Sequence, residues 1–226
     1  MSNVIAAFNS KGGSAKSTAI LVLADTFARQ GASVSVIDTD PQRTIANWRE
    51  QAKTSTIHLV EETNSISIHR TIKEETARSA WVFVDMAGFT SDMRTPVVSR
   101  SNLIIVPMQA SPEDARMAAR AFGLISADED TLNRHVNKKI LWARTIPNMI
   151  QRVERRILDE INANSVPSFA NHLHERSAYK AMMLEGKPLG SIDQDQFNGV
   201  PKAIENADRL AAEIIEHFIT MKETSV

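Results

Sequence analysis

Two lysines lie five residues apart in the stretch FNSKGGSAKST, which spans residues 8–18. Lys16 is followed by Ser17, and two adjacent glycines precede them in the same stretch. The backbone N–H groups of such a turn form a concave site for phosphate oxygens, and a helix that begins there adds a partial positive charge. Lys16 would then bind the β- and γ-phosphates of a nucleotide, and the Ser17 hydroxyl would ligate Mg²⁺. Lys11 is a second cation, which one nucleotide does not require.

This loop departs from the standard G-x-x-x-x-G-K-S/T pattern, because Ser10 and Ala15 stand where that pattern has glycine. Gly12 and Gly13 can still adopt positive φ and let the backbone approach an anion. The methyl group of Ala15 is tolerated if its φ is negative. The alternative is a plain glycine turn between a strand and a helix. The predicted nucleotide-binding residues of the loop are Lys11, Gly12, Gly13, Ser14, Ala15, Lys16, Ser17 and Thr18.

Carboxylates follow at the ends of two later apolar runs. The segment VIDTDPQ contains Asp38 and Asp40, and WVFVDMAG contains Asp85 and Gly88. Open α/β sheets bind ligands at the carboxyl ends of their strands, which is where these acids are expected. Asp85 would accept a hydrogen bond from Mg²⁺-bound water, and Gly88 would let its segment respond to the γ-phosphate. Helix-capping aspartates and a buried strand with a polar end are the alternatives that involve no chemistry.

Short apolar runs alternate with helical stretches along the whole chain. The predicted strands are Val4–Phe8, Ser33–Asp38, Trp81–Asp85, Leu103–Pro107, Lys139–Thr145 and, less regularly, Ser168–His174. The predicted helices are Lys16–Gln30, Ser65–Ser79, Pro112–Ala127, Ile150–Ala163 and Pro201–Met221. This alternation predicts an α/β fold with a doubly wound, mostly parallel sheet and helices on both faces. We expect one domain over residues 1–226, without an N-terminal helix-turn-helix module.

Composition excludes several classes of protein. The chain has 226 residues, a net charge of -1 and no cysteine, so disulfides, thiolate metal sites and iron–sulfur clusters are excluded. A balanced charge gives no general attraction to nucleic acid, and DNA binding would need a local basic face. No apolar run is long enough to span a bilayer, and no signal-peptide pattern is present. We therefore expect a cytoplasmic protein.

The pattern K-G-G-x-x-K-S/T resembles the deviant Walker A loop of the ParA/MinD family of ATPases, and D-x-D-P-Q resembles that family's switch segment. The resemblance implies ATP or ADP with Mg²⁺ as cofactors, and a homodimer that sandwiches two nucleotides. It makes Lys11 the signature lysine, which reaches the partner subunit's phosphates. It also implies that Asp38 supports the Mg²⁺ shell with Ser17 and Asp85, and that Asp40 orients the attacking water. Lys11, Lys16 and Asp40 are accordingly the predicted catalytic residues.

Later segments resemble the same family less specifically. In LIIVPMQASPEDA, Pro107 is expected near the nucleotide, although a strand-ending proline is an equal alternative. In ILWART, Arg144 and Thr145 stand where the family's adenine contacts lie. The stretch HERSAYKAMMLEGKPLG resembles the family segment that precedes the last helix.

Basic residues cluster late in the chain. The predicted DNA-binding residues are Arg152, Arg155, Arg156, Arg176 and Lys180. Such side chains would bind phosphates without reading sequence, and the alternative is a solvated surface balanced by interspersed glutamates. By the resemblance, the ATP-bound dimer binds nonspecific DNA, and a centromere-binding adaptor protein stimulates slow hydrolysis and release. The predicted function is therefore DNA partition on the nucleoid.

Three other functions remain open on the sequence. A MinD-like ATPase would bind membrane through a basic C-terminal helix, but Glu213, Glu216 and Glu223 outnumber Lys222 there, so we expect no membrane binding. A conjugative-transfer ATPase or accessory protein shares the fold and is not separated from a partition ATPase. A small-molecule ligase or kinase on this fold is disfavoured by Lys11.

Overall fold

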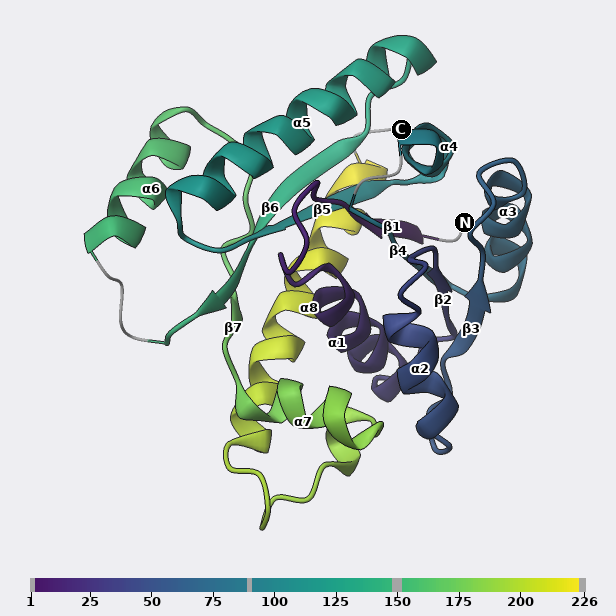
Figure 1. Ribbon diagram of the computed structural model, residues 1–226, viewed down its shortest axis with the longest axis vertical. Coiled ribbons are helices and arrows are strands. Elements are labelled where there is room, and N and C mark those ends of the chain that lie inside the picture. The colour runs from purple at the N-terminus through teal and green to yellow at the C-terminus, as the bar shows by residue number, and fades with distance from the viewer. Residues whose placement is uncertain (1–2, 89–90, 148–151, 224–226) are drawn as a thin grey trace.

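The computed structural model describes residues 3–88, 91–147 and 152–223. Its centre is a seven-stranded sheet in the order β3-β2-β4-β1-β5-β6-β7, and the strand pairs within these residues are parallel (Figure 1). The strands are β1 (Asn3–Ala7), β2 (Val34–Asp38), β3 (His58–Glu61), β4 (Trp81–Asp85), β5 (Leu103–Met108), β6 (Asn137–Thr145) and β7 (Leu173–His174). The predicted doubly wound α/β fold is confirmed.

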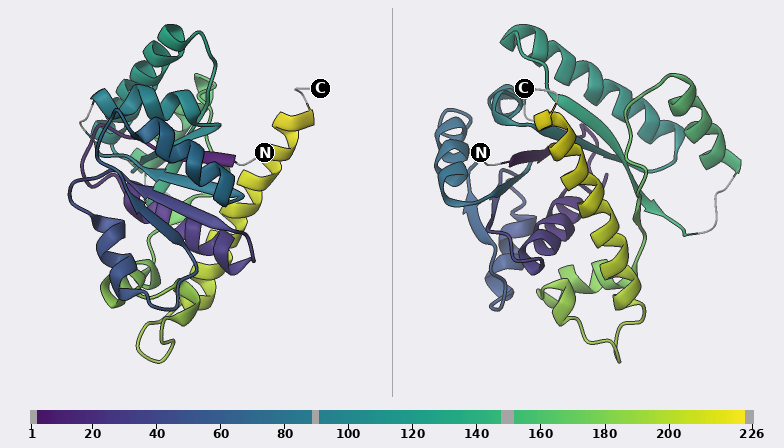
Figure 2. Two further views of the ribbon diagram at one scale, coloured as in Figure 1. Left: turned by 90° about the vertical axis from the view of Figure 1, so that its right-hand side faces the viewer. Right: turned by 180° about the vertical axis from the view of Figure 1, so that it is seen from behind.

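Helices cover both faces of the sheet and bury alternate strand residues. Ile5 and Ala7 of β1 pack toward one group of helices, whereas Val4 and Ala6 pack toward the other. The first group comprises α1 (Lys16–Arg29), α2 (Thr44–Gln51), α7 (Ser177–Glu185) and α8 (Val200–Glu223). The second comprises α3 (Ile68–Arg78), α4 (Ser91–Arg100), α5 (Pro112–Leu132) and α6 (Arg152–Ala163). The rear view shows α8 running along α1 (Figure 2).

The structure adds elements that the sequence patterns did not predict. Strand β3 has four residues at the sheet edge, and α2 has eight residues without a side-chain cap of its own. Helix α4 contains Pro96, a residue type that disfavours helix interiors. The expected strand at Ser168–His174 shrinks to β7 and one bridge between Ile140 and Ser168. The predicted start of α6 at Ile150 lies outside the described residues.

Strand order brings the sequence motifs together. Asp85 of β4 is the register partner of Asp38 in β2 on one side and of Ala7 in β1 on the other. The loop that follows β1 is the lysine-containing loop. Three motifs from distant parts of the sequence therefore meet at the edge formed by the carboxyl ends of the strands. This edge lies where the strand order reverses, which is where open α/β sheets bind ligands.

A buried acid fastens the segment after α7 to α1. Asp25 is 4% exposed and accepts a hydrogen bond from the Leu189 backbone N–H at 3.0 Å, at the start of a short 3₁₀ helix, η1 (Leu189–Ser191). Burial raises the pKa of Asp25 to about 6. The native state therefore keeps this proton over a range in which the unfolded state has lost it, and the free energy of unfolding should fall as pH rises from about 4 to about 6.

We expect Asp25→Asn to remove this pH dependence, because asparagine still accepts from Leu189 without a buried charge. At pH 7 the variant should gain on the order of 2 kcal/mol relative to wild type, and the gain should vanish near pH 4. Urea unfolding at several pH values measures it. Asp159→Asn, at an exposed position of α6, is the control. A pH-independent difference would contradict this origin.

Candidate nucleotide-binding site

The loop between β1 and α1 has the backbone shape of a phosphate-binding turn. Gly13 has φ 73°, whereas Gly12 is not in the positive-φ region, so only one of the two glycines uses its conformational freedom. Ser14 is 1% exposed, and its hydroxyl has no hydrogen-bond partner within the described residues. A buried hydroxyl without a partner at a helix N-terminus fits a phosphate oxygen as the missing acceptor.

Ala15 adopts the conformation that the standard glycine at this position permits. Its φ is 72° and its ψ is 24°, directly before the first residue of α1. The φ of Ala15 is therefore positive, not negative as tolerance of the methyl group was expected to require, and its backbone lies in the left-handed region. Its neighbours in the loop and helix hold it there, at a cost of about 1 kcal/mol.

We expect Ala15→Gly to stabilise the protein by relieving this strain. A gain of about 1 kcal/mol corresponds to a rise in melting temperature of about 2–4 °C for a chain of this length. The matched variant is Gly13→Ala, which has nearly the same φ and no atom within 4 Å of an added Cβ. It should lower the melting temperature by a similar amount. Thermal unfolding followed by circular dichroism measures both, and destabilisation by Ala15→Gly would refute the strain.

Both lysines of the loop have carboxylates nearby, but in different surroundings. Lys16 is 7% exposed; burial lowers the pKa of its ammonium, and the charges of Asp85 and Asp40 oppose that shift. Lys11 is held against α5, where its Nζ lies 3.3 Å from Asp114 Oδ2 and 3.4 Å from Glu113 Oε2. In this conformation the second lysine is paired within its own chain.

Asp85 is the carboxylate best suited to a bound cation. It is 1% exposed, and both of its oxygens lack a hydrogen-bond partner within the described residues. Burial raises the pKa of Asp85 to about 7, and the charges of Asp38 and Asp40 act in the same direction. Lys16 and the nearby Ser17 hydroxyl lower this pKa, although the hydroxyl does not form a hydrogen bond with the carboxylate. Ser17 and Asp85 thus fit Mg²⁺ that is completed by phosphate oxygens and water.

Asp38 is occupied by the backbone. Its Oδ2 accepts from the N–H groups of Ile45 and Ala46 at 3.1 and 3.0 Å, and its Oδ1 accepts from Asp40 at 3.1 Å. Asp38 therefore caps α2 from the preceding strand, which is the helix-capping alternative raised by the sequence. The contacts give it a positioning role for the loop that carries Asp40, rather than that of a direct Mg²⁺ ligand.

Asp40 lies beyond the end of β2 and is only partly buried. Its Oδ1 accepts from the Gln42 N–H at 2.9 Å, which leaves further acceptor capacity on the carboxylate. Asp38 fixes the position of this acid by holding the Asp40 N–H. A carboxylate so placed can accept a proton or a hydrogen bond from water.

A cavity of about 400 Å³ continues from the phosphate loop and is large enough for a nucleoside; we call it the adenosine cavity. Ala15 and Thr18 line it from the loop side, Arg144 from the end of β6, and Leu173 and Met183 supply apolar surface. Arg144 has φ 57°, so a left-handed turn directs the chain here. Thr145, in contrast, lines a different pocket, where its hydroxyl lies 2.8 Å from His174 Nδ1. Of the two predicted adenine contacts, the structure brings only Arg144 to the loop.

Pro107 lies inside β5, and all residues of that strand are buried. Its carbonyl accepts from the Asn9 side-chain amide at 2.8 Å, and Asn9 Oδ1 in turn accepts from the Lys11 N–H at 3.0 Å. Pro107 therefore connects to the phosphate loop through Asn9. Asn9 is not among the predicted site residues, although its place directly after the first predicted strand was a signal.

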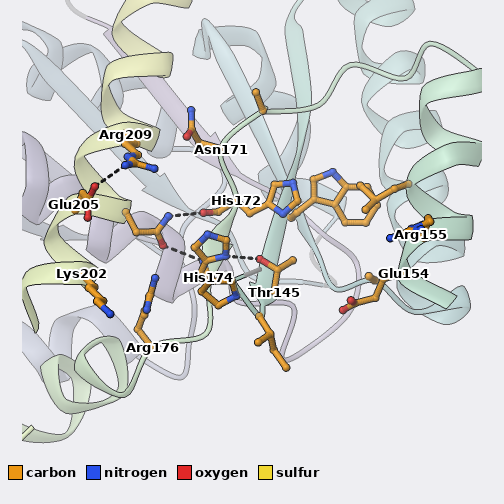
Figure 3. A pocket seen from close by; sticks show the side chains of 17 residues that line it. Thr145, Glu154, Arg155, Asn171, His172, His174, Arg176, Lys202, Glu205 and Arg209 are labelled. Carbon is orange, nitrogen blue, oxygen red and sulfur yellow. Dashed lines mark hydrogen bonds and ion pairs between the residues drawn. The ribbon is translucent and has the colours of Figure 1, made fainter. Parts of the chain in front are cut away.

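A second pocket of about 620 Å³ is rich in cationic side chains (Figure 3). We call it the basic pocket, and its cations are Arg155, Arg176, Lys202 and Arg209. Glu154 and Glu205 also line it, and Arg209 pairs with Glu205 at 2.5 Å. The Nε of Arg176 is buried without a hydrogen-bond partner in the described part of the chain. Four cations against two acids give this pocket an excess of positive charge.

The predicted DNA-binding residues divide among three places. Arg155 and Arg176 share the basic pocket, and Arg152 and Arg156 line a groove against α5. Lys180 lines the adenosine cavity, as Arg176 also does, and pairs with Glu175. Lys202 and Arg209 were missed. Their spacing of seven residues on the last helix puts them on one face, which was a usable signal.

Comparison with known proteins gives two sequence relationships. The chain matches the family described as VirC1 protein over residues 2–217. It is 30% identical over 214 residues to protein ParA of Rhizobium radiobacter, covering 94% of this chain and 96% of that protein.

Solved structures share the fold at low identity. A Cyanothece McdA variant in complex with ATP has a TM-score of 0.74 at 12% identity, covering 94% of this chain and 96% of that one. A putative plasmid partition protein of Borrelia burgdorferi, bound to AMPPNP, has a TM-score of 0.69 at 14% identity, covering 96% and 100%.

Proposed function

The chain belongs to the VirC1 family and is a ParA/MinD-type partition or positioning ATPase, and on this premise we propose that ATP and Mg²⁺ switch it between a monomer and a DNA-binding dimer. The observation that carries the proposal is the meeting of Lys16, Asp40 and the unpartnered carboxylate of Asp85 at one sheet edge. The ATP and AMPPNP complexes of proteins with this fold support the choice of nucleotide.

In this proposal each residue has a separate task. Lys16 and the backbone of the loop hold the phosphates, Ser17 and Asp85 hold Mg²⁺, and Asp40 orients water at the γ-phosphate. Bound Mg²⁺ supplies charge neutralisation on the phosphates. Lys11 leaves Asp114 and reaches the partner subunit's phosphates, so ATP favours the dimer and hydrolysis removes that bias. Intrinsic hydrolysis is slow until an adaptor protein stimulates it.

Nonspecific DNA is the proposed ligand of the basic pocket. Its four cations come from three places: α6, the segment directly before α7, and α8. A dimer would join two such pockets into one DNA-binding surface. This accounts for DNA binding by a chain whose net charge is -1. Retention on the nucleoid would follow from it.

Lys202→Ala tests this assignment, because Lys202 lines the basic pocket and, unlike Arg176, does not line the adenosine cavity. Removing one phosphate contact should make the negative slope of log affinity against log salt concentration shallower by about 1 per subunit. The change should be the same for unrelated DNA sequences. Fluorescence anisotropy with labelled duplexes and a nonhydrolysable ATP analogue measures the slope. Lys73→Ala, an exposed lysine on α3, is the control. DNA binding by wild type that does not depend on nucleotide would refute the switch.

A MinD-like membrane ATPase is the second candidate, and α8 argues against it. Glu213 accepts from the backbone N–H groups of Ala170 and Asn171, both at 2.8 Å, and Phe218 is 5% exposed. The helix is thus packed on the domain as far as Phe218, whereas Ile219 is 52% exposed and begins a mostly exposed last turn. Among the described residues, no helix is long and apolar enough to cross a membrane.

A further inference from the structure

A groove between α5 and α6 lies apart from the adenosine cavity and the basic pocket. Its volume is about 1050 Å³, and its surface is mainly apolar. On the α5 side the lining residues include Ala115, Ala118, Ala119 and Phe122, which share one helix face. On the α6 side they include Val153, Ile157 and Ile161. Figures 1 and 2 show the two helices beside each other at the β6 side of the sheet.

Helix α6 has an apolar face but contributes few side chains to the hydrophobic core. Ile157 is its one buried residue in the described range, and Val153 is 54% exposed. Opposite it, the small side chains of Ala115, Ala118 and Ala119 would let another helix approach α5 closely. The stretches of α5 and α6 that line the groove are each roughly 15–18 Å long, which corresponds to three helical turns.

The charges around the groove are mostly positive. Arg116 on α5 and Arg152 and Arg156 on α6 line it, and Glu160 is the acid among the lining residues. None of these three guanidinium groups forms a hydrogen bond or salt bridge within residues 3–88, 91–147 and 152–223. An occupant with apolar residues on one face and acidic residues beside them would satisfy both the groove and its arginines.

We propose that this groove docks an acidic amphipathic helix of a partner protein, about three turns long. The apolar surface favours a protein over DNA, because a phosphate backbone would leave that surface without a complement. Pro112 and Ala115 of the groove bracket Glu113 and Asp114, which hold Lys11. A docked helix therefore lies against the turn of α5 that controls the second lysine. Its identification with the adaptor rests on the proposed function.

The test uses a fluorescein-labelled synthetic peptide of 18 residues with leucines on one helical face and glutamates beside them. We expect saturable anisotropy with the full chain in the absence of nucleotide and DNA, so the result does not depend on ATPase activity. A peptide with lysines in place of the glutamates should bind at least about tenfold more weakly. The triple variant Arg116→Glu, Arg152→Glu, Arg156→Glu should reverse this preference.

Two further variants separate docking from misfolding. Ala119→Trp fills the groove from an exposed position and should block both peptides, whereas Arg120→Glu, exposed on α5 outside the groove, should leave binding unchanged. Absence of saturable binding, or equal affinity for both peptides, overturns the proposal. Loss of DNA retention in the triple variant would make the groove a DNA surface. A nucleotide-free dimer that this variant dissociates would make it an interface between two copies.

Discussion

Lys11→Ala is expected to abolish ATP-dependent dimerisation while ATP binding by the monomer stays within a few-fold of wild type. In the free chain the Lys11 ammonium lies against Asp114 and Glu113 on α5, and Lys16 occupies the buried position beside Asp85. The nucleotide of the same subunit therefore depends on Lys16, and Lys11 is the cation available to a second subunit. Turnover should fall about 10²–10³-fold, as for the loss of one group that stabilises transition-state charge.

Light scattering after size exclusion, with a nonhydrolysable ATP analogue, measures the dimer, and phosphate release measures turnover. Lys16→Ala is the informative comparison, because it should weaken nucleotide binding itself. Lys73→Ala, on the exposed surface of α3, controls for the loss of a positive charge. A Lys11→Ala protein that still dimerises and hydrolyses ATP like wild type would rule out the sandwich dimer.

Asp40→Ala is expected to separate hydrolysis from the ATP-bound state. The Asp40 carboxylate lies beyond the end of β2. Within the described residues its Oδ1 accepts one hydrogen bond from a backbone N–H, whereas Asp38 accepts from two backbone N–H groups at the start of α2. If Asp40 orients the attacking water, its loss should lower turnover about 10²–10⁴-fold. The dimer and its DNA complex should then persist, because ATP is bound but not consumed.

Single-turnover phosphate release and the lifetime of the DNA complex after removal of free ATP measure the two effects. Asp195→Ala, at an exposed position before α8, is the matched control. If Asp40→Ala also lost ATP binding or the dimer, its role would be in forming the nucleotide site rather than in the hydrolytic step.

The sequence predicted those parts of the fold whose signals are local. Buried parallel strands are apolar along their length, and Trp81–Asp85 is found as predicted. The missing elements are those whose stability comes from elsewhere in the chain. Helix α2 is capped by Asp38 from the preceding strand, and α4 tolerates Pro96 while burying Met93 and Val97 in the core.

The same distinction applies to the candidate site. Residue types and spacing by themselves determined a phosphate loop with a second lysine and the acids at the ends of two later strands, because each of these signals lies within a few neighbouring residues. Only the tertiary structure decided what those residues contact. Strand order placed Asp38 beside Asp85, backbone donors occupied Asp38, and the loop path forced Ala15 to positive φ. Packing of α5 against the loop paired Lys11 with Asp114, which no local pattern could have shown.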